Sequence, residues 1–218
     1  MKLLLTSCGN ANKSIEKALL ELLGKPFKKA NLTFVPTAAN VNEGDKSWLL
    51  NDMNNFKKLG FASFDIIDIS SVPRHIWLKS FKKADVFVFG GGDTYYLSKW
   101  IKKSGLLEIL PKLLKTRVYV GISAGSMVTA KNISLATVGI LYYEKYGKLK
   151  NKSGLGLVDF ELRPHLNSNW FPKIRLPYLK KLAEKVPYSF YAIDDDTAIK
   201  VVGNKISIIS EGEWKKFN

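Results

Sequence analysis

The stretch "VYVGISAGSMVTA", residues 118–130, decides the fold class because it joins an apolar strand to a helix through a glycine-rich turn. Its first residues are apolar and β-branched, which favours a buried strand, and Gly-x-Ser-x-Gly follows. A tight strand-to-helix turn lifts the residue at its apex clear of the backbone, and only small residues fit beside it. Gly121, Ala124 and Gly125 are small. Ser123 is therefore predicted to be exposed at the carboxyl end of a strand.

Outside this stretch, apolar runs alternate with segments of helical periodicity. The alternation predicts an α/β fold, a doubly wound and mostly parallel sheet with helices on both faces. A Gly203-Asn204 turn predicts an antiparallel hairpin near the C-terminus, at the edge of the sheet. Ser14 is predicted to cap the first helix and Gly24 to follow its end. We expect a single domain over residues 1–218. The expected parallel strands are residues 2–6, 32–35, 64–69, 86–89 and 118–121.

Composition limits the partners and the compartment. The net charge is +15, but the lysines occur as pairs spread along the sequence, and only four residues are arginine. This pattern is typical of a solvated surface, so we expect no specific nucleic-acid partner. No apolar run approaches the roughly 18 residues needed to cross a bilayer, so we expect no membrane partner. Cys8 is the single cysteine, which excludes an internal disulfide, and a cytoplasmic location is expected.

A serine hydroxyl attacks a carbonyl only when a base removes its proton. The chain has two histidines. His75 precedes a predicted helix and is interpreted as a surface residue. His165 lies in the polar loop "ELRPHLNSN", and loops anchored on a sheet often carry catalytic residues. We therefore expect His165 to be the base.

The base in turn needs a carboxylate that holds its tautomer and stabilises the imidazolium. The segment "YAIDDDTAIKV" supplies Asp194, Asp195 and Asp196 between two apolar runs. Asp159 and Glu161 lie nearer to His165 in the sequence. Spacing alone does not decide among these five carboxylates.

A second glycine stretch, "VFVFGGGDTYYL", also follows an apolar strand. Residues 90–92 can aim backbone N–H groups at a negatively charged oxygen, and Asp93 or Thr94 is predicted to cap the next helix. A phosphate-binding loop is the competing interpretation. It lacks both the Walker lysine and the Gly-x-Gly-x-x-Gly spacing.

Taken together, "MKLLLTSCGN", "VFVFGGGDTYYL", "GISAGSMV", "RPHLN" and "AIDDDTAI" resemble the aspartyl dipeptidase (dipeptidase E) and cyanophycinase family of serine peptidases. The resemblance implies a class I glutamine amidotransferase-like fold. It implies that Ser123 is the nucleophile, that His165 is the base, and that the N–H groups of Gly91 and Ala124 form the oxyanion hole. In the last motif, cyanophycinase-like members have glutamate as the acid where this chain has Asp195, so the resemblance implies that Asp195 is the acid of the triad. Aspartate is one methylene shorter, so Asp194 and Asp196 stay as substitutes for the acid.

The resemblance also implies a function. It implies hydrolysis of small peptides with an aspartyl residue at the cleaved bond, and a nearby cation that recognises this residue. Arg163 and Arg175 are the candidates for substrate binding. No metal or organic cofactor is expected, and the protein is expected to be a monomer or a homodimer. The rival hypothesis is a non-catalytic protein on the same fold that binds an anion or another small ligand.

Overall fold

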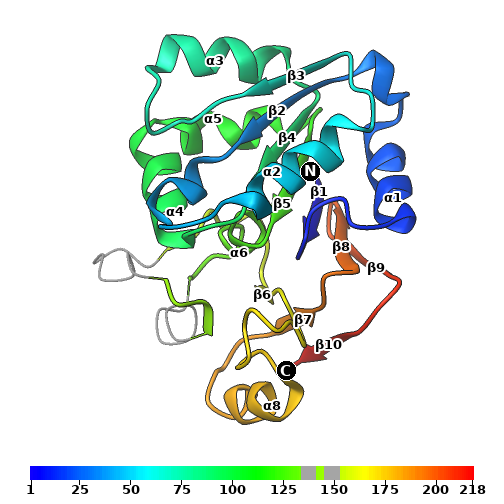
Figure 1. Ribbon diagram of the computed structural model, residues 1–218, viewed down its shortest axis with the longest axis vertical. Coiled ribbons are helices and arrows are strands. Elements are labelled where there is room, and N and C mark those ends of the chain that lie inside the picture. The colour runs from blue at the N-terminus through cyan, green and yellow to red at the C-terminus, as the bar shows by residue number, and fades with distance from the viewer. Residues whose placement is uncertain (134–140, 145–152) are drawn as a thin grey trace.

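The main sheet has five adjacent parallel strands, which reach one edge, and an antiparallel pair at the other edge (Figure 1). The computed structural model describes residues 1–133, 141–144 and 153–218. The strand order is β3-β2-β4-β5-β1-β8-β9, and the first five of these strands are parallel to one another. The strands are β1 (Lys2–Thr6), β2 (Asn31–Val35), β3 (Ser63–Ile66), β4 (Val86–Phe89), β5 (Val118–Ile122), β8 (Thr197–Val202) and β9 (Lys205–Ser210).

Helices cover both faces of this sheet, as expected for a doubly wound fold. Successive residues of a strand point to opposite faces. In β1, Leu4 packs in the core under α1 (Lys13–Leu23) and α2 (Ser47–Lys57), whereas Leu3 and Leu5 pack in a second core. That second core lies under α3 (Arg74–Lys83), α4 (Thr94–Lys103) and α5 (Leu106–Leu113). The predicted α/β class is confirmed.

A second, three-stranded sheet lies beside the carboxyl ends of the main strands, and the sequence pattern did not predict it (Figure 1). Its order is β10-β7-β6, with β6 (Glu161–Arg163), β7 (Phe190–Ile193) and β10 (Trp214–Phe217). The helix α8 (Leu176–Ala183) connects β6 to β7. Two of these strands end just before predicted site residues, because β6 leads into His165 and β7 leads into Asp195.

Several local predictions can be compared with the structure. The hairpin of β8 and β9 turns at Gly203 and Asn204 and lies at the sheet edge, as predicted. The prediction that Ser14 caps α1 is wrong, since Asn12 accepts the Ile15 N–H at 3.0 Å and the helix begins at Lys13. In the third strand the pairing ends at Ile66, three residues earlier than expected. Within the described ranges, no helix has the length and apolar character needed to cross a membrane. A single domain over residues 1–218 stays a prediction.

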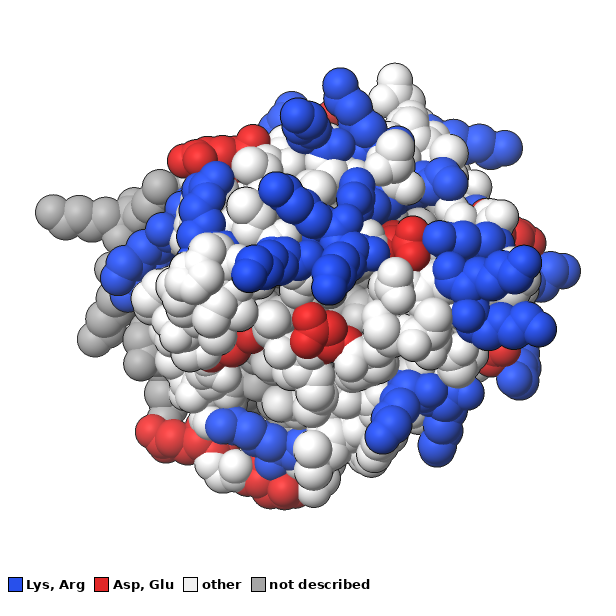
Figure 2. Space-filling view, turned by 90° about the horizontal axis from the view of Figure 1, so that it is seen from above, with Lys and Arg blue, Asp and Glu red and all other residues white. Residues whose placement is uncertain are grey.

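Lysine pairs that are far apart in the sequence come together at the amino end of the main sheet. The helices return there before each parallel strand begins, and α2 and α3 end in lysine pairs. Contacts tie these ends together, because the Arg117 guanidinium donates to the Lys82 carbonyl at 2.8 Å and Lys25 pairs with Asp85 at 2.8 Å. Figure 2 shows lysine and arginine side chains crowding the face where α3 and β3 lie in Figure 1. We call Lys25, Lys28, Lys29, Lys57, Lys58, Lys82 and Lys83 the amino-end lysine cluster.

Candidate active site

Ser123 occupies a strained turn between β5 and the short helix α6 (Ala124–Met127). Its φ of 47° lies in the left-handed region, which costs a non-glycine residue on the order of 1–3 kcal/mol. The turn tolerates no larger neighbours, because a Cβ at Gly121 would lie 2.6 Å from the Gly125 carbonyl oxygen. A Cβ at Gly125 would collide with the Phe89 carbonyl oxygen. The residues that surround Ser123 therefore form the strand-to-helix turn that their sequence predicts.

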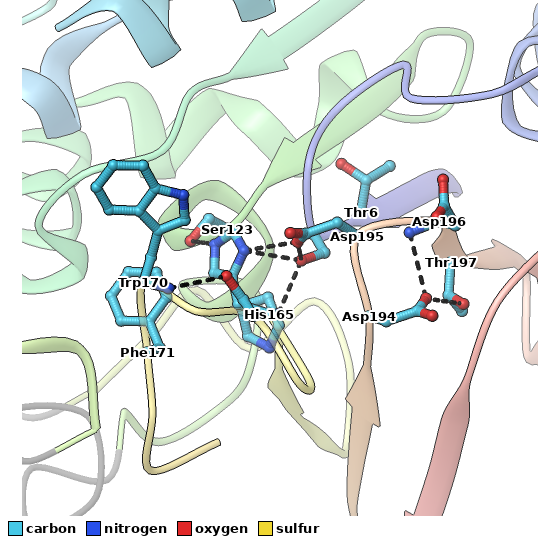
Figure 3. A network of polar contacts seen from close by, with 12 residues as sticks. Thr6, Ser123, His165, Trp170, Phe171, Asp194, Asp195, Asp196 and Thr197 are labelled. Carbon is cyan, nitrogen blue, oxygen red and sulfur yellow. Dashed lines mark hydrogen bonds and ion pairs between the residues drawn. The ribbon is translucent and has the colours of Figure 1, made fainter. Parts of the chain in front are cut away.

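His165 and Asp195 lie in line with the Ser123 hydroxyl (Figure 3). The Nε2 atom of His165 is 2.9 Å from Ser123 Oγ, and its Nδ1 atom is 2.7 Å from Asp195 Oδ1. The three residues come from separate parts of the chain, at the ends of β5, β6 and β7. The ring of Phe171 stacks on the imidazole, with ring centroids 4.9 Å apart. An alcohol, an imidazole and a carboxylate in this row can transfer a proton from the alcohol to the ring.

The other carboxylates that the sequence offered have different partners. Asp194 accepts hydrogen bonds from the Thr197 hydroxyl at 2.6 Å and from the N–H of Glu213, so it stabilises its own turn. Asp196 is exposed, and its backbone carbonyl accepts the Asn12 amide at 2.9 Å. Asp159 is exposed and pairs with Lys131. Of the three adjacent aspartates, Asp195 is the one that contacts His165.

The second histidine lies elsewhere. His75 is exposed on the first turn of α3. The helix α3 follows β3 and precedes β4 in the chain, and it packs on one face of the main sheet. This placement agrees with its interpretation as a surface residue.

The surroundings of Asp195 keep its carboxylate ionised. Burial alone would raise its pKa, but hydrogen bonds from His165 and Ser7 and the charge of an imidazolium outweigh burial, so the pKa lies below its ordinary value. An ionised Asp195 accepts the Nδ1–H of the neutral ring. The Nε2 atom is then left as the acceptor that faces Ser123.

Gly91 and Ala124 lie beside Ser123. A Cβ built at Gly91 would be 3.5 Å from the Ser123 Cβ and 3.5 Å from the ring of Trp48. Ala124 directly follows Ser123 as the first residue of α6 and is fully buried. Among the described residues, neither of these N–H groups donates a hydrogen bond to another protein group. Both groups are therefore free to donate to an oxygen bound beside Ser123.

The two arginines that were expected to contact substrate differ in placement. Arg163 is 1% exposed and pairs with Glu161 at 2.5 Å, over the ring of Phe190. Arg175 is half-buried, and its Nη1 donates to the carbonyls of Ser168, Phe171 and Ile174. Arg163 thus has a structural carboxylate partner, whereas Arg175 belongs to the loop that carries Phe171. The substrate role of both residues stays a prediction.

Sequence reasoning missed three residues of the site. Ser7, the first residue after β1, contacts both His165 and Asp195. Phe171 packs on the imidazole. Asp52 of α2 is 7% exposed, and burial and the nearby charge of Asp195 raise its pKa to about 7. The rule that pointed to Ser123, a polar residue at the carboxyl end of a parallel strand, also applies to Ser7. Phe171 and Asp52 carry no comparable signal.

No metal site accompanies these residues in the part of the chain that the structure describes. Within residues 1–133, 141–144 and 153–218, no three His, Cys, Asp or Glu side chains are grouped so that they could hold a metal ion. The site is composed of the side chains named above and of two backbone N–H groups.

Comparisons with known proteins identify the family to which the chain is similar. The sequence profile of peptidase family S51 matches residues 3–209. An uncharacterized peptidase of Listeria monocytogenes is 28% identical over 80% of this chain and 83% of its own length. A peptidase E of a Nostoc species is 27% identical over 89% of this chain and 81% of its own.

Solved structures share the fold. A Listeria monocytogenes protein that is provisionally named a peptidase E superposes with a TM-score of 0.79 at 24% identity, over 97% of this chain and 98% of its own. A peptidase from an acI-B1 actinobacterium gives a TM-score of 0.71 at 18% identity, over 98% and 88% of the two chains. The family profile spans nearly the whole sequence. The chain therefore belongs to peptidase family S51, and it is a serine-type peptidase.

Proposed function

We propose that this peptidase hydrolyses small peptides at an aspartyl residue through a triad of Ser123, His165 and Asp195. The observation that carries the proposal is the hydrogen-bonded row itself, with 2.9 Å from Ser123 Oγ to His165 Nε2 and 2.7 Å from His165 Nδ1 to Asp195 Oδ1. These separations are normal hydrogen-bond lengths, so the proton can move without a rearrangement. The proposed location is the cytoplasm.

In the proposed first step, Ser123 Oγ forms a bond to the carbonyl carbon while its proton passes to His165 Nε2. The carbonyl oxygen becomes negative and accepts hydrogen bonds from the N–H groups of Gly91 and Ala124, which are rigid and cost little reorganisation. Asp195 stabilises the imidazolium that forms. The carbon–nitrogen bond then breaks, and the imidazolium gives its proton to the leaving amine.

In the second step, a water molecule gives a proton to His165 Nε2 and attacks the acyl-enzyme carbonyl. The same two N–H groups again hold the oxyanion. The ester bond breaks, Ser123 regains its proton from the imidazolium, and the acid product leaves. Each proton that the base accepts is returned, so no external acid or base is consumed.

Arg175 is the better of the two candidates for recognition of an aspartyl side chain. Arg163 is neutralised by Glu161 in the interior. Arg175 uses one nitrogen, Nη1, on loop carbonyls, and its other nitrogens make no hydrogen bond to the described residues. A guanidinium fork suits a carboxylate because it can donate two parallel hydrogen bonds. A cation there would also offset the repulsion between the Asp195 carboxylate and an acidic substrate.

The test is a panel of dipeptides that vary only at the first residue. We expect kcat/KM to be highest for aspartyl dipeptides. The Arg175→Gln variant should lose about 10- to 100-fold in kcat/KM for an aspartyl substrate relative to its asparaginyl counterpart, since one charged hydrogen-bond partner is removed. Comparing the two substrates cancels any general damage to the loop.

Arg74→Gln is the matched control, because Arg74 is exposed on α3 and pairs with Glu108. It should retain the aspartyl preference. A panel without such a preference would contradict the proposed specificity. Peptides that raise the melting temperature but are never cleaved would favour the rival hypothesis of a binding protein.

A further inference from the structure

The hydroxyl of Ser7 makes three contacts with two residues of the proposed triad, His165 and Asp195. Ser7 is fully buried at the end of β1. Its Oγ accepts the backbone N–H of His165 at 2.8 Å, donates to Asp195 Oδ1 at 2.6 Å, and lies 3.1 Å from His165 Nδ1. No other side chain of the described residues touches both the base and the acid in this way.

A hydroxyl has one hydrogen and two acceptor lone pairs. Since the carboxylate of Asp195 can only accept, the single hydrogen of Ser7 points to Asp195. One lone pair of Ser7 accepts the backbone N–H of His165, and the second faces Nδ1. Nδ1 must therefore carry its hydrogen, which is shared between Asp195 Oδ1 and Ser7 Oγ. This requirement leaves Nε2 as the acceptor for the Ser123 hydroxyl.

Ser7 also holds the backbone of the base. His165 has a φ of 65°, a left-handed conformation that is unfavourable for a residue with a Cβ. Its N–H is satisfied by Ser7, and the next N–H, that of Leu166, donates to the Ile193 carbonyl at 2.9 Å. These two hydrogen bonds fix the loop against the ends of β1 and β7. The ring of His165 is thereby aimed at Ser123.

Thr6, the residue before Ser7, holds the backbone of the proposed nucleophile in place. The Thr6 carbonyl accepts the Ser123 N–H at 3.1 Å and the Ser126 hydroxyl at 2.8 Å. Figure 3 shows Thr6 on the strand that runs alongside the site. Thr6, the last residue of β1, and Ser7, the residue after it, therefore together contact all three segments that carry the proposed triad.

We infer that Ser7 is a positioning residue, which sets the tautomer and the orientation of His165 and holds Asp195 in place. The inference rests on the proposed function. Ser7 touches neither substrate nor Ser123 Oγ in any contact described above, so its effect on the reaction passes through His165 and Asp195.

The first test is the Ser7→Ala variant. We expect kcat to fall about 10- to 100-fold, the effect of losing a hydrogen bond to a charged group, while KM changes by no more than about threefold. Ser7→Thr, which keeps the hydroxyl, should recover most of the lost kcat. A Ser7→Ala enzyme with the parent kcat would overturn the inference.

The matched control is Ser80→Ala, which also removes a buried serine hydroxyl. Ser80 lies on α3 and shares a 2.7 Å hydrogen bond with Thr33, away from the site. It should lose thermal stability but keep the parent kcat. A kcat loss in both variants, in proportion to their melting temperatures, would mean that Ser7 serves stability alone.

A measurement on the parent protein does not depend on how well the variant folds. With two histidines in the chain, ¹⁵N-histidine spectra can be assigned with His75→Asn. We expect the neutral His165 ring to carry its hydrogen on Nδ1, and the Nε2–H tautomer would overturn the inference. If the parent has this tautomer and Ser123→Ala stays fully active, the proposed function fails but the geometric part of the inference stands. If the parent depends on Ser123 and is indifferent to Ser7→Ala, only the role of Ser7 fails.

Discussion

Asp195 is the carboxylate on which the proposed proton transfer depends. Its Oδ1 atom is the hydrogen-bond partner of both His165 Nδ1 and Ser7 Oγ. Asp195→Asn would present an amide to the ring and favour the wrong tautomer. We expect kcat to fall about 10⁴-fold, as for a neutralised triad aspartate in serine proteases. Steady-state kinetics on a cleaved dipeptide measure this change.

Asp196→Asn is the control for this prediction, because the Asp196 side chain is exposed. It should change kcat less than about twofold. The assignment of the acid would be wrong if Asp195→Asn stayed active and Asp196→Asn did not.

The site could be predicted only in part at the level of single residues. Ser123 and His165 were found because the glycine turn and the polar loop after an apolar run have recognisable patterns. The spacing of Asp194, Asp195 and Asp196 did not decide among them, since the choice depends on how far each side chain turns after β7, and only the family resemblance pointed to Asp195. The partner of Arg163 was not predicted either. In a strand of alternating side chains, Glu161 and Arg163 lie on the same face, and this spacing could have indicated their pairing.

At the level of secondary-structure elements, the turn between β5 and α6 is predicted to tolerate no side chain at Gly125. Gly125→Ala should destabilise the protein by about 1–3 kcal/mol or more, because the new Cβ would collide with the Phe89 carbonyl oxygen and the backbone must shift. The shift would move Ser123, so activity should fall as well. Urea unfolding and dipeptide hydrolysis measure the two effects.

Gly44→Ala is the control for the turn. Gly44 has a φ of 81° but has no atom within 4 Å of a built Cβ, so it should cost only the strain of the left-handed backbone, about 1 kcal/mol, with activity retained. Equal losses of activity in both variants would contradict the steric explanation.

Asp52 on α2 leads to a prediction about how stability depends on pH. Burial, and then the charge of Asp195, raise the pKa of Asp52 from its ordinary value of 3.8 to about 7. The folded state therefore binds a proton that the unfolded state releases. This contribution to stability is complete below about pH 4 and is lost as the pH rises through about 7. Asp52→Asn should stabilise the protein at pH 8, by at most on the order of 4 kcal/mol, and change little at pH 4.

The free energy of unfolding of parent and variant, measured from pH 4 to 8, checks this prediction. Asp65→Asn serves as the control, since Asp65 is exposed on β3 and should leave the pH profile unchanged. If Asp52→Asn showed the same pH dependence as the parent, Asp52 would not be protonated in the folded state.

At the same level, the main sheet could be predicted because its strands are continuous apolar runs of normal length. The second sheet was missed for a physical reason. The strand β6 has three residues, and two of them, Glu161 and Arg163, are charged, so the segment lacks an apolar run. The strand β10 contains two lysines and is mostly exposed, so its sequence resembles a solvated tail.

In the folded molecule, lysine pairs that are spread along the sequence lie at one end of the main sheet. The pairs of the amino-end lysine cluster are separated by 20 or more residues, yet the fold returns each helix to the same end of the sheet. Two of these segments lie side by side, because Phe27 and Lys28 of one and Leu59 of the other line the same shallow groove. The proposed triad lies at the opposite, carboxyl end of the parallel strands.

This clustering predicts salt-dependent retention on a polyanion. Replacing Lys28, Lys29, Lys57 and Lys58 by Glu should lower the salt concentration that elutes the protein from heparin, because fewer counterions are released on binding. The same charge change at Lys173, Lys180, Lys181 and Lys185, on and around α8, should lower it less. Equal shifts would show that net charge alone, and not the cluster, determines retention.

The most direct test of the whole account is to identify the residue that a fluorophosphonate probe modifies, by mass spectrometry of the digested protein. We predict a single adduct on Ser123, which is absent from Ser123→Ala and slowed by orders of magnitude in His165→Ala. An adduct on another residue, or undiminished labelling of Ser123→Ala, would contradict the proposed acyl-enzyme mechanism.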